Sequence, residues 1–417
     1  MITLVRATLL AATVLMAIAS EAGAQASAPI NFDGLPRKQQ PAKAPAPAKS
    51  DSSAKQHKPP VAAAAPVVRV DTLYRTFVDT VRLIQLVDTA TLRALRAPAP
   101  AAVPAPSFGV NGLSQVTFTG GDATRSTYRL RRIELKVTAD LGDRAQAVLM
   151  VDAAKSLALS TSGAQTTVNQ SSRMLQDAFV SIPVSRLTID AGQERLPLGY
   201  EGSMGASGLE TVERALMESE KARSASFGDV RDAGVSVKQT WSFVDYRVGL
   251  FNGSGETMND VDKQVAKALV GAVAFHPGFL EGFRVGASGA TSGSAAGDNP
   301  TRDRVGADVR FARGPVALQA EAMSGQDGAT RRLGAYALAT WAFHKQAKVV
   351  ARVDSWDPDR AADNTAANVA EHDYLGGFTW LPAGTRLKLQ LNVVRKTYVA
   401  GLVPSSTLVL SQLQASW

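Results

Sequence analysis

Hydrophobic and polar residues alternate one by one through most of the chain between Phe108 and Trp417. In residues 133–140, Ile, Leu, Val and Ala alternate with Glu, Lys, Thr and Asp, and in residues 387–393 Leu and Val alternate with Lys, Gln and Asn. A period of two places successive side chains on opposite faces of a β-strand. The pattern predicts sixteen strands, at 108–118, 127–141, 144–155, 173–183, 186–195, 231–242, 244–252, 266–276, 282–292, 302–313, 315–325, 331–343, 346–356, 371–382, 385–396 and 407–417.

The connections between these strands are alternately very short and long. The short ones are turns such as 141–143, 183–185, 313–315, 344–345 and 382–384. The long ones include 156–172, 196–230, 253–265, 357–370 and 397–406. An outer-membrane barrel has this asymmetry, with short periplasmic turns, long external loops and strands of about 9–11 residues. We therefore expect an all-β fold, a 16-stranded antiparallel transmembrane β-barrel with apolar side chains facing lipid and polar side chains facing the lumen.

One strand does not follow this rule. Arg129 and Arg131 fall on the phase that should face lipid. Two explanations are open. The strand contains a β-bulge that shifts its phase, or the two arginines extend to the lipid head groups at the outer rim.

Aromatic residues gather at one end of the predicted strands. They lie at or beside predicted periplasmic turns or the terminus, at Trp241, Phe243, Phe275, Phe279, Trp341, Phe343, Trp380 and Trp417. Amphipathic rings prefer the boundary between water and hydrocarbon, and the core aromatics of a soluble β protein would scatter along the strands instead. The clustering favours an interfacial girdle, with Trp417 closing the last strand.

The first 106 residues have a different composition. Arg6, the apolar run 7–19 and the small residues before Gln25 predict a secretory signal peptide at 1–24. Residues 25–66 are rich in Pro, Ala and Lys and predict a disordered linker that cannot form a core.

Residues 67–96 carry a heptad-like apolar stripe that predicts a short helix able to form a coiled coil, although their β-branched residues also suit a strand-like stretch. An Ala/Pro spacer at 97–106 leads into the barrel at 107–417.

Cysteine usage and charge narrow the interpretation. The chain has no cysteine, which excludes disulfides and thiolate chemistry. Its net charge is +8, but residues 1–106 hold 12 of the 45 basic and 6 of the 37 acidic residues. The barrel region is therefore nearly neutral, and the overall charge does not by itself indicate an anion-attracting pore.

Several segments, in this order, resemble the phosphate-selective porin O/P family. They are RLRRIEL (129–135), LQDAFV (175–180), LTIDAGQ (187–193), LPLGYE (196–201), VER (212–214), VRDAGV (230–235) and YRVGLFNGSG (246–255). The resemblance implies a sixteen-stranded barrel, a homotrimer and an inner loop that constricts the pore. It also implies passage of anions, which in some members include phosphate.

The residues themselves also point to a constriction. The connection 196–230 is the longest in the barrel, and a sixteen-stranded barrel leaves a wide lumen. We expect this loop to fold inward, although a loop that covers the outer rim is the alternative. Five charged residues in or beside it are candidates for the constriction: Glu213, Arg214, Lys221, Arg223 and Arg231.

Rings of Lys or Arg in a lumen favour anions. Six basic residues on the predicted lumen phase are candidates for the anion path: Lys136, Arg247, Arg310, Lys348, Arg352 and Lys388. Acidic residues share this phase, namely Glu134, Asp190, Asp308, Glu321 and Asp354. The acids of the loop, Glu201, Glu210, Glu213, Glu218, Glu220 and Asp229, weigh against a strong phosphate site because like charges repel.

Enzymatic chemistry has no support in the sequence. None of the four histidines lies in a pattern with a nucleophilic serine or with metal-ligand spacing, and no cofactor fingerprint is present. We expect a passive outer-membrane channel for small hydrophilic solutes with a mild preference for anions, and no nucleic-acid partner.

Two alternatives stay open. One is a non-selective general porin. The other is a structural tether with a plugged barrel, whose periplasmic N-terminal arm binds peptidoglycan.

Overall fold

The computed structural model describes residues 105–142, 144–157, 159–162, 165–168, 174–218, 228, 230–253, 267–292, 302–360, 365 and 368–417. The predictions for the signal peptide, the linker 25–66, the segment 67–96 and most of the spacer 97–106 lie outside these residues. Lys221 and Arg223 of the predicted constriction also lie outside them. No helix among the described residues is long and apolar enough to cross a membrane.

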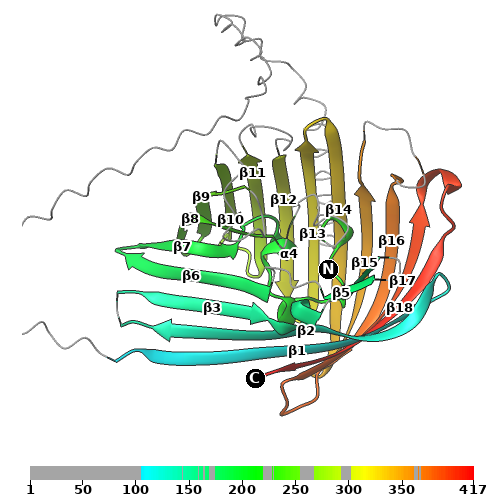
Figure 1. The fold of residues 1–417 in the computed structure, drawn as a ribbon, viewed down its shortest axis with the longest axis horizontal. Coiled ribbons are helices and arrows are strands. Elements are labelled where there is room, and N and C mark those ends of the chain that lie inside the picture. Colours follow the sequence, from blue (N-terminus) through cyan, green and yellow to red (C-terminus); the bar gives the residue numbers. More distant parts are fainter. Residues whose placement is uncertain are drawn as a thin grey trace, which may run out of the picture. The chain divides into compact units, whose positions relative to one another are not determined.

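Sixteen antiparallel strands of the described chain close into one barrel, with β1 paired to β18 (Figure 1). They are β1 (Ser107–Gly121), β2 (Thr124–Asp140), β3 (Gln146–Asp152), β6 (Leu175–Val184), β7 (Leu187–Arg195), β8 (Arg231–Thr240), β9 (Val244–Phe251), β10 (Ala268–Phe275), β11 (Phe283–Ser292), β12 (Arg302–Arg313), β13 (Val316–Asp327), β14 (Thr330–His344), β15 (Ala347–Asp357), β16 (Glu371–Trp380), β17 (Leu387–Tyr398) and β18 (Ser406–Ser416). Each predicted strand corresponds to one of them, so the predicted fold class is confirmed.

Three smaller features lie in the connections after β3 and β17. The strands β4 (Leu159–Ser162) and β5 (Gln165–Val168) form a two-stranded sheet in the connection between β3 and β6, which the sequence pattern did not predict. The short 3₁₀ helices η1 (Ala153–Leu157) and η5 (Val399–Gly401) follow β3 and β17. We call the barrel end with the short β-turns the turn end and the opposite end the loop end.

The last residue completes the barrel against the first strand. Gly112 and Trp417 exchange two backbone hydrogen bonds, of 3.0 and 3.1 Å. A Cβ atom on Gly112 would lie 2.0 Å from the Trp417 ring, so only glycine leaves space for the indole on the outer face. The sequence therefore places its smallest residue opposite its terminal tryptophan, near the turn end.

A β-bulge explains the two arginines that broke the alternation. On β1, Gln115 pairs with Arg132 while Val116 pairs with Leu130, so Arg131 is the extra residue. The bulge reverses the phase of the strand and turns Arg129 and Arg131 into the lumen. Of the two explanations, the bulge is correct.

Exposed aromatic side chains form contacts with one another at the turn end. Trp241 stacks on Phe243 with ring centroids 6.4 Å apart, and Phe243 contacts Phe275 at the same distance. Trp341 and Phe343 form a second pair at 5.8 Å. All five side chains are exposed, as expected for rings at a membrane boundary.

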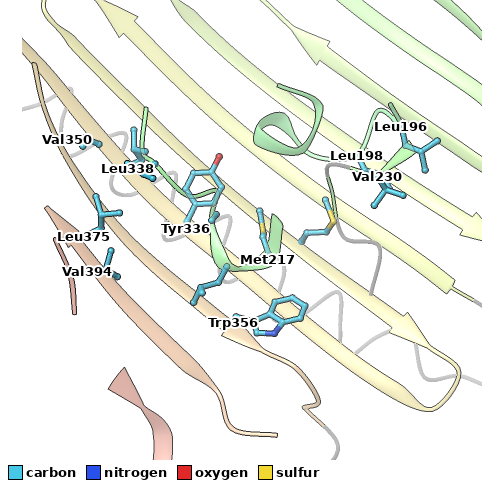
Figure 2. Close-up of a cluster of buried hydrophobic side chains, with 14 of the residues drawn as sticks. Leu196, Leu198, Met217, Val230, Tyr336, Leu338, Val350, Trp356, Leu375 and Val394 are labelled. Carbon is cyan, nitrogen blue, oxygen red and sulfur yellow. The ribbon is translucent and has the colours of Figure 1, made fainter. Parts of the chain in front are cut away.

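The lumen is less polar than the alternation predicted. A cluster of buried hydrophobic side chains lies inside the barrel, contributed by the inward phase of several strands and by the loop after β7 (Figure 2). Its wall residues include Tyr336, Leu338, Val350, Trp356, Leu375 and Val394, and Met217 of the loop packs among them. The expectation that the inward phase is polar was therefore wrong along this wall, because a folded loop covers it and excludes water there.

Candidate functional site

The segment that follows β7 lies within the barrel. Its described part contains α4 (Tyr200–Ser203), η3 (Ala206–Gly208) and η4 (Leu216–Glu218). We call residues 196–218 the inner segment. Hydrogen bonds fix it to the inward faces of β11, β13, β15 and β17, so its path follows from the polar groups that these strands present.

The first anchor is on β13. Glu321 accepts hydrogen bonds from the backbone N–H groups of Tyr200 at 2.8 Å and Glu201 at 3.1 Å. Gly199 has a positive φ of 70°, and a Cβ atom there would lie 2.3 Å from Glu321 Oε1. A residue with a side chain would therefore be strained and would also displace the carboxylate that receives the start of the inner segment.

The second anchor is on β15. The guanidinium of Arg352 donates to Thr211 Oγ1 at 2.9 Å and to the carbonyl oxygens of Glu213 at 2.9 Å and Arg214 at 3.3 Å. Asp354, two residues along the strand, accepts from the backbone N–H of Leu216 at 2.8 Å. A single pair of charged residues thus binds both donors and acceptors of the loop backbone, and both are buried.

The third anchor is on β17. Lys388 donates to the carbonyl oxygens of Ser207 at 2.8 Å and Leu209 at 3.1 Å. Asn392 Oδ1 accepts from the backbone N–H of Val212 at 2.7 Å. On β15, Lys348 adds an ion pair with Glu210.

Three of the six predicted anion-path residues are therefore occupied by the inner segment. Arg352 is only 4% exposed and Lys388 only 8%, and Lys348 is paired with Glu210. The alternation correctly places them on the inward face, but it carries no information on which part of that face a loop covers. In the structure their charged groups bind the loop, and Arg352 and Lys388 are almost fully buried.

The other three predicted residues lie on open parts of the lumen wall. Lys136 is exposed and lines a cavity of about 510 Å³ next to the inner segment. Arg247 is ion-paired with Glu194 and donates to Ser236 Oγ at 3.2 Å. Arg310 is half-buried and lies directly opposite Arg284 on the paired strand β11.

The described constriction candidates differ in what they contact. Glu213 is ion-paired with Arg131 on the wall strand β2. Arg214 is buried and donates to the carbonyl oxygens of Glu201 and Met204, so it stabilises the fold of the segment itself. Arg231 is buried at the start of β8 and ion-paired with Asp177 at 2.7 Å.

A basic wall lies at the turn-end half of the lumen, from the turn between β6 and β7 round to β12. Arg186, Lys238, Arg247 and Arg284 line a cavity of about 400 Å³. We define the basic wall as these four residues together with Arg310. Sequence reasoning selected only Arg247 and Arg310, although Lys238 and Arg284 carried the same signal of an inward phase.

In each ion pair of the basic wall, the basic side chain is more exposed to the lumen than its acidic partner. Lys238 pairs with Asp190 at 2.5 Å, Arg247 pairs with Glu194, and Arg284 pairs with Asp308. The basic side chains are 41%, 24% and 22% exposed, whereas their acidic partners are 0%, 3% and 6% exposed. The surface that meets the lumen water is therefore predominantly cationic, because these three carboxylates lie behind their partners; Asp245, which is 39% exposed and contacts His276, also lines this cavity.

The inner segment narrows the lumen without filling it. Cavities lie on both of its sides, one of about 210 Å³ beside Arg129 and Lys396, and the one of about 510 Å³ beside Lys136. Among the residues that the structure describes, no group of His, Asp and Glu is arranged to hold a metal ion.

The closed sixteen-stranded barrel with an inward-folded loop defines the chain as an outer-membrane porin. Residues 109–293 match the family described as phosphate-selective porin O and P, which confirms the resemblance seen in the sequence. No curated protein matches the chain.

Solved structures share this fold at low sequence identity. An anion-selective porin from Comamonas acidovorans has a TM-score of 0.51 and 13% identity, covering 75% of this chain and 100% of its own. The outer membrane channel DcaP of Acinetobacter baumannii has a TM-score of 0.55 and 12% identity, covering 78% and 100%. OmpF of Salmonella typhi has a TM-score of 0.51 and 11% identity, covering 74% and 97%.

Proposed function

We propose that this porin is a passive channel for small hydrophilic solutes and that it prefers anions. The observation that carries the preference is the orientation of the ion pairs on the basic wall, where cations face water and carboxylates are buried behind them. Fixed positive charge along an aqueous path lowers the energy of a passing anion and raises that of a cation. The phosphate selectivity in the description of the matching family and the anion selectivity of the Comamonas porin support the same preference.

The inner segment is the constriction in this proposal. Its anchors on β13, β15 and β17 hold it across the lumen, and the open cavities on both sides leave a route for solutes. These cavities also favour a channel over a plugged tether. A narrow, water-filled path with oriented charges is what a diffusion pore needs, since it selects by size and sign without chemistry.

The N-terminal arm and the oligomeric state belong to the same proposal. The first strand begins at the turn end, which supports a periplasmic arm if the short turns are periplasmic as in other barrels. There the arm, residues 25–106, would be in reach of peptidoglycan. The family resemblance supports a homotrimer in outer-membrane lipid.

The reversal potential of single channels in a KCl gradient tests the anion preference. Wild-type channels should pass chloride about threefold more readily than potassium. The double variant Arg186→Glu with Arg310→Glu reverses charge on the basic wall, and within the described chain neither side chain forms an ion pair that the change would break. We expect its reversal potential to move to zero or to the cation side.

A matched control makes the same change in total charge away from the lumen. Arg313→Glu with Lys345→Glu alters two exposed residues at turns, and it should keep the wild-type reversal potential. A wild-type channel without any preference, or an equal shift in both double variants, would refute the role of the basic wall.

A further inference from the structure

The cavity on the loop-end side of the inner segment has two main kinds of lining residue. It encloses about 210 Å³ and is lined by basic and by aliphatic residues, together with Thr119, Glu213 and Asp373. We call it the vestibule cavity. Its basic residues are Arg129, Arg131, Arg214, Arg352 and Lys396, and its aliphatic residues are Leu216, Val394, Leu408 and Leu410.

Most of the positive charge in the vestibule cavity is already neutralised. Arg131 forms a bidentate ion pair with Glu213, and Lys396 pairs with Glu371 at 2.5 Å and Asp373 at 3.2 Å. Arg214 and Arg352 are buried and donate to loop carbonyl oxygens. These four cations have little capacity left for a solute.

Arg129 differs from the other four. Its side chain is 51% exposed, and its nearest acidic group is Glu213 at 3.8 Å, which is already occupied by Arg131. The bulge at Arg131 is what turns this guanidinium inward. The vestibule cavity therefore presents one accessible positive charge that can form bidentate hydrogen bonds with a carboxylate.

The aliphatic lining residues set the second requirement for a ligand. Leu216, Val394 and Leu410 line the cavity, are buried and offer no side-chain hydrogen bonds. A small, strongly hydrated anion such as phosphate would lose water there without compensation, and the carboxylates of Glu213 and Asp373 would repel its second charge. An apolar body, in contrast, gains from the contact.

We propose that the vestibule cavity binds organic monoanions that combine one carboxylate with an apolar body, such as aromatic or branched aliphatic carboxylates, on their way to the constriction. The carboxylate pairs with Arg129 and the apolar body packs on Leu408, Leu410 and Val394. The volume is sufficient, since an engineered protein cavity of about 150 Å³ holds benzene. This inference rests on the proposed channel function and specifies its substrate class.

Current block in planar bilayers tests the proposal. Benzoate, acetate and inorganic phosphate are added on the loop-end side of single wild-type channels that carry chloride. Benzoate should interrupt the current at about tenfold lower concentration than acetate or phosphate, because only benzoate combines a carboxylate for Arg129 with an apolar ring for the aliphatic residues. The variants Arg129→Gln and Leu408→Ser should each raise the blocking concentration of benzoate by about five- to tenfold.

Arg395→Gln is the control for Arg129→Gln. Arg395 is equally exposed, at 51%, on the outward phase of the neighbouring part of the barrel, and its loss should leave benzoate block unchanged. Insertion into the bilayer as an open channel shows that each variant is folded, whatever its chloride conductance. If wild-type channels conduct with anion preference but block equally with all three anions, or if Arg129→Gln blocks like wild type, this inference is wrong. An absence of conductance in the wild type would instead overturn the proposed function.

Discussion

Replacing Arg352 with alanine is expected to release the inner segment from the wall and make the channel noisy. The guanidinium is buried and donates to Thr211 and to two loop carbonyl oxygens, and its Nε lies 3.4 Å from Asp354. The variant leaves these acceptors and the Asp354 carboxylate without a buried cation, which costs about 3–5 kcal/mol when one member of a buried pair is lost. We expect frequent conductance steps and a mean open conductance about twofold above wild type.

Single-channel recording checks this prediction, and proteolysis of the folded barrel within residues 205–218 provides a second readout. Arg395→Ala removes an arginine of the outer face and should change neither measurement. Wild-type noise and wild-type protection of the segment in Arg352→Ala would show that the arginine is not an anchor.

Substitution of Gly334 by valine is expected to displace the inner segment by steric overlap alone. A Cβ atom at Gly334 would lie 2.3 Å from Met217 Cβ and 3.0 Å from Trp356 Cε3. Met217 is fully buried and its Cβ is fixed to the backbone, so the η4 turn has to move away from the wall. We expect a change of at least about twofold in single-channel conductance, with the barrel itself intact.

Gly376→Val is the matched variant. This glycine is also on a strand, but an added Cβ atom would meet no atom within 4 Å. Its conductance should equal that of wild type. If both valine variants behave alike, close packing of η4 against β14 does not determine the pore.

The strands could be predicted because a period of two is a local property of the sequence. In the sequence the bulge appeared only as two arginines, Arg129 and Arg131, on the phase that should face lipid. Its position follows from the pairing of β1 with β2, which the sequence does not give. Pairing register is a relation between two segments. A single segment can show that something interrupts the alternation without showing what does.

The positions that the inner segment covers could have been recognised by a second pattern. Val349 with Val350 and Val393 with Val394 are apolar on both phases of their strands, which indicates burial on both faces. Such pairs mark where a loop packs inside the barrel. No comparable signal predicted that the inner segment covers Arg352 and Lys388. The alternation pattern of a basic residue on the inward phase is the same whether a loop covers that residue or water does.

The orientation of the ion pairs on the basic wall could not be predicted from the sequence either. Lys238 and Arg284 are on the inward phase, but their value depends on which end of each ion pair faces water. That orientation follows from the depth of Asp190 and Asp308 beneath their partners, which arises only when the strands are side by side. Counting charges in the sequence gives a nearly neutral barrel and contains no information on the orientation of the ion pairs.

The single-channel conductance of a barrel without residues 199–228, joined by a short Gly-Ser link, tests the central claim most directly. If these residues form the constriction, the deletion variant should show a conductance several-fold above wild type, with the anion preference reduced as the lumen widens. A deletion variant that inserts into bilayers and keeps the wild-type conductance would contradict the account.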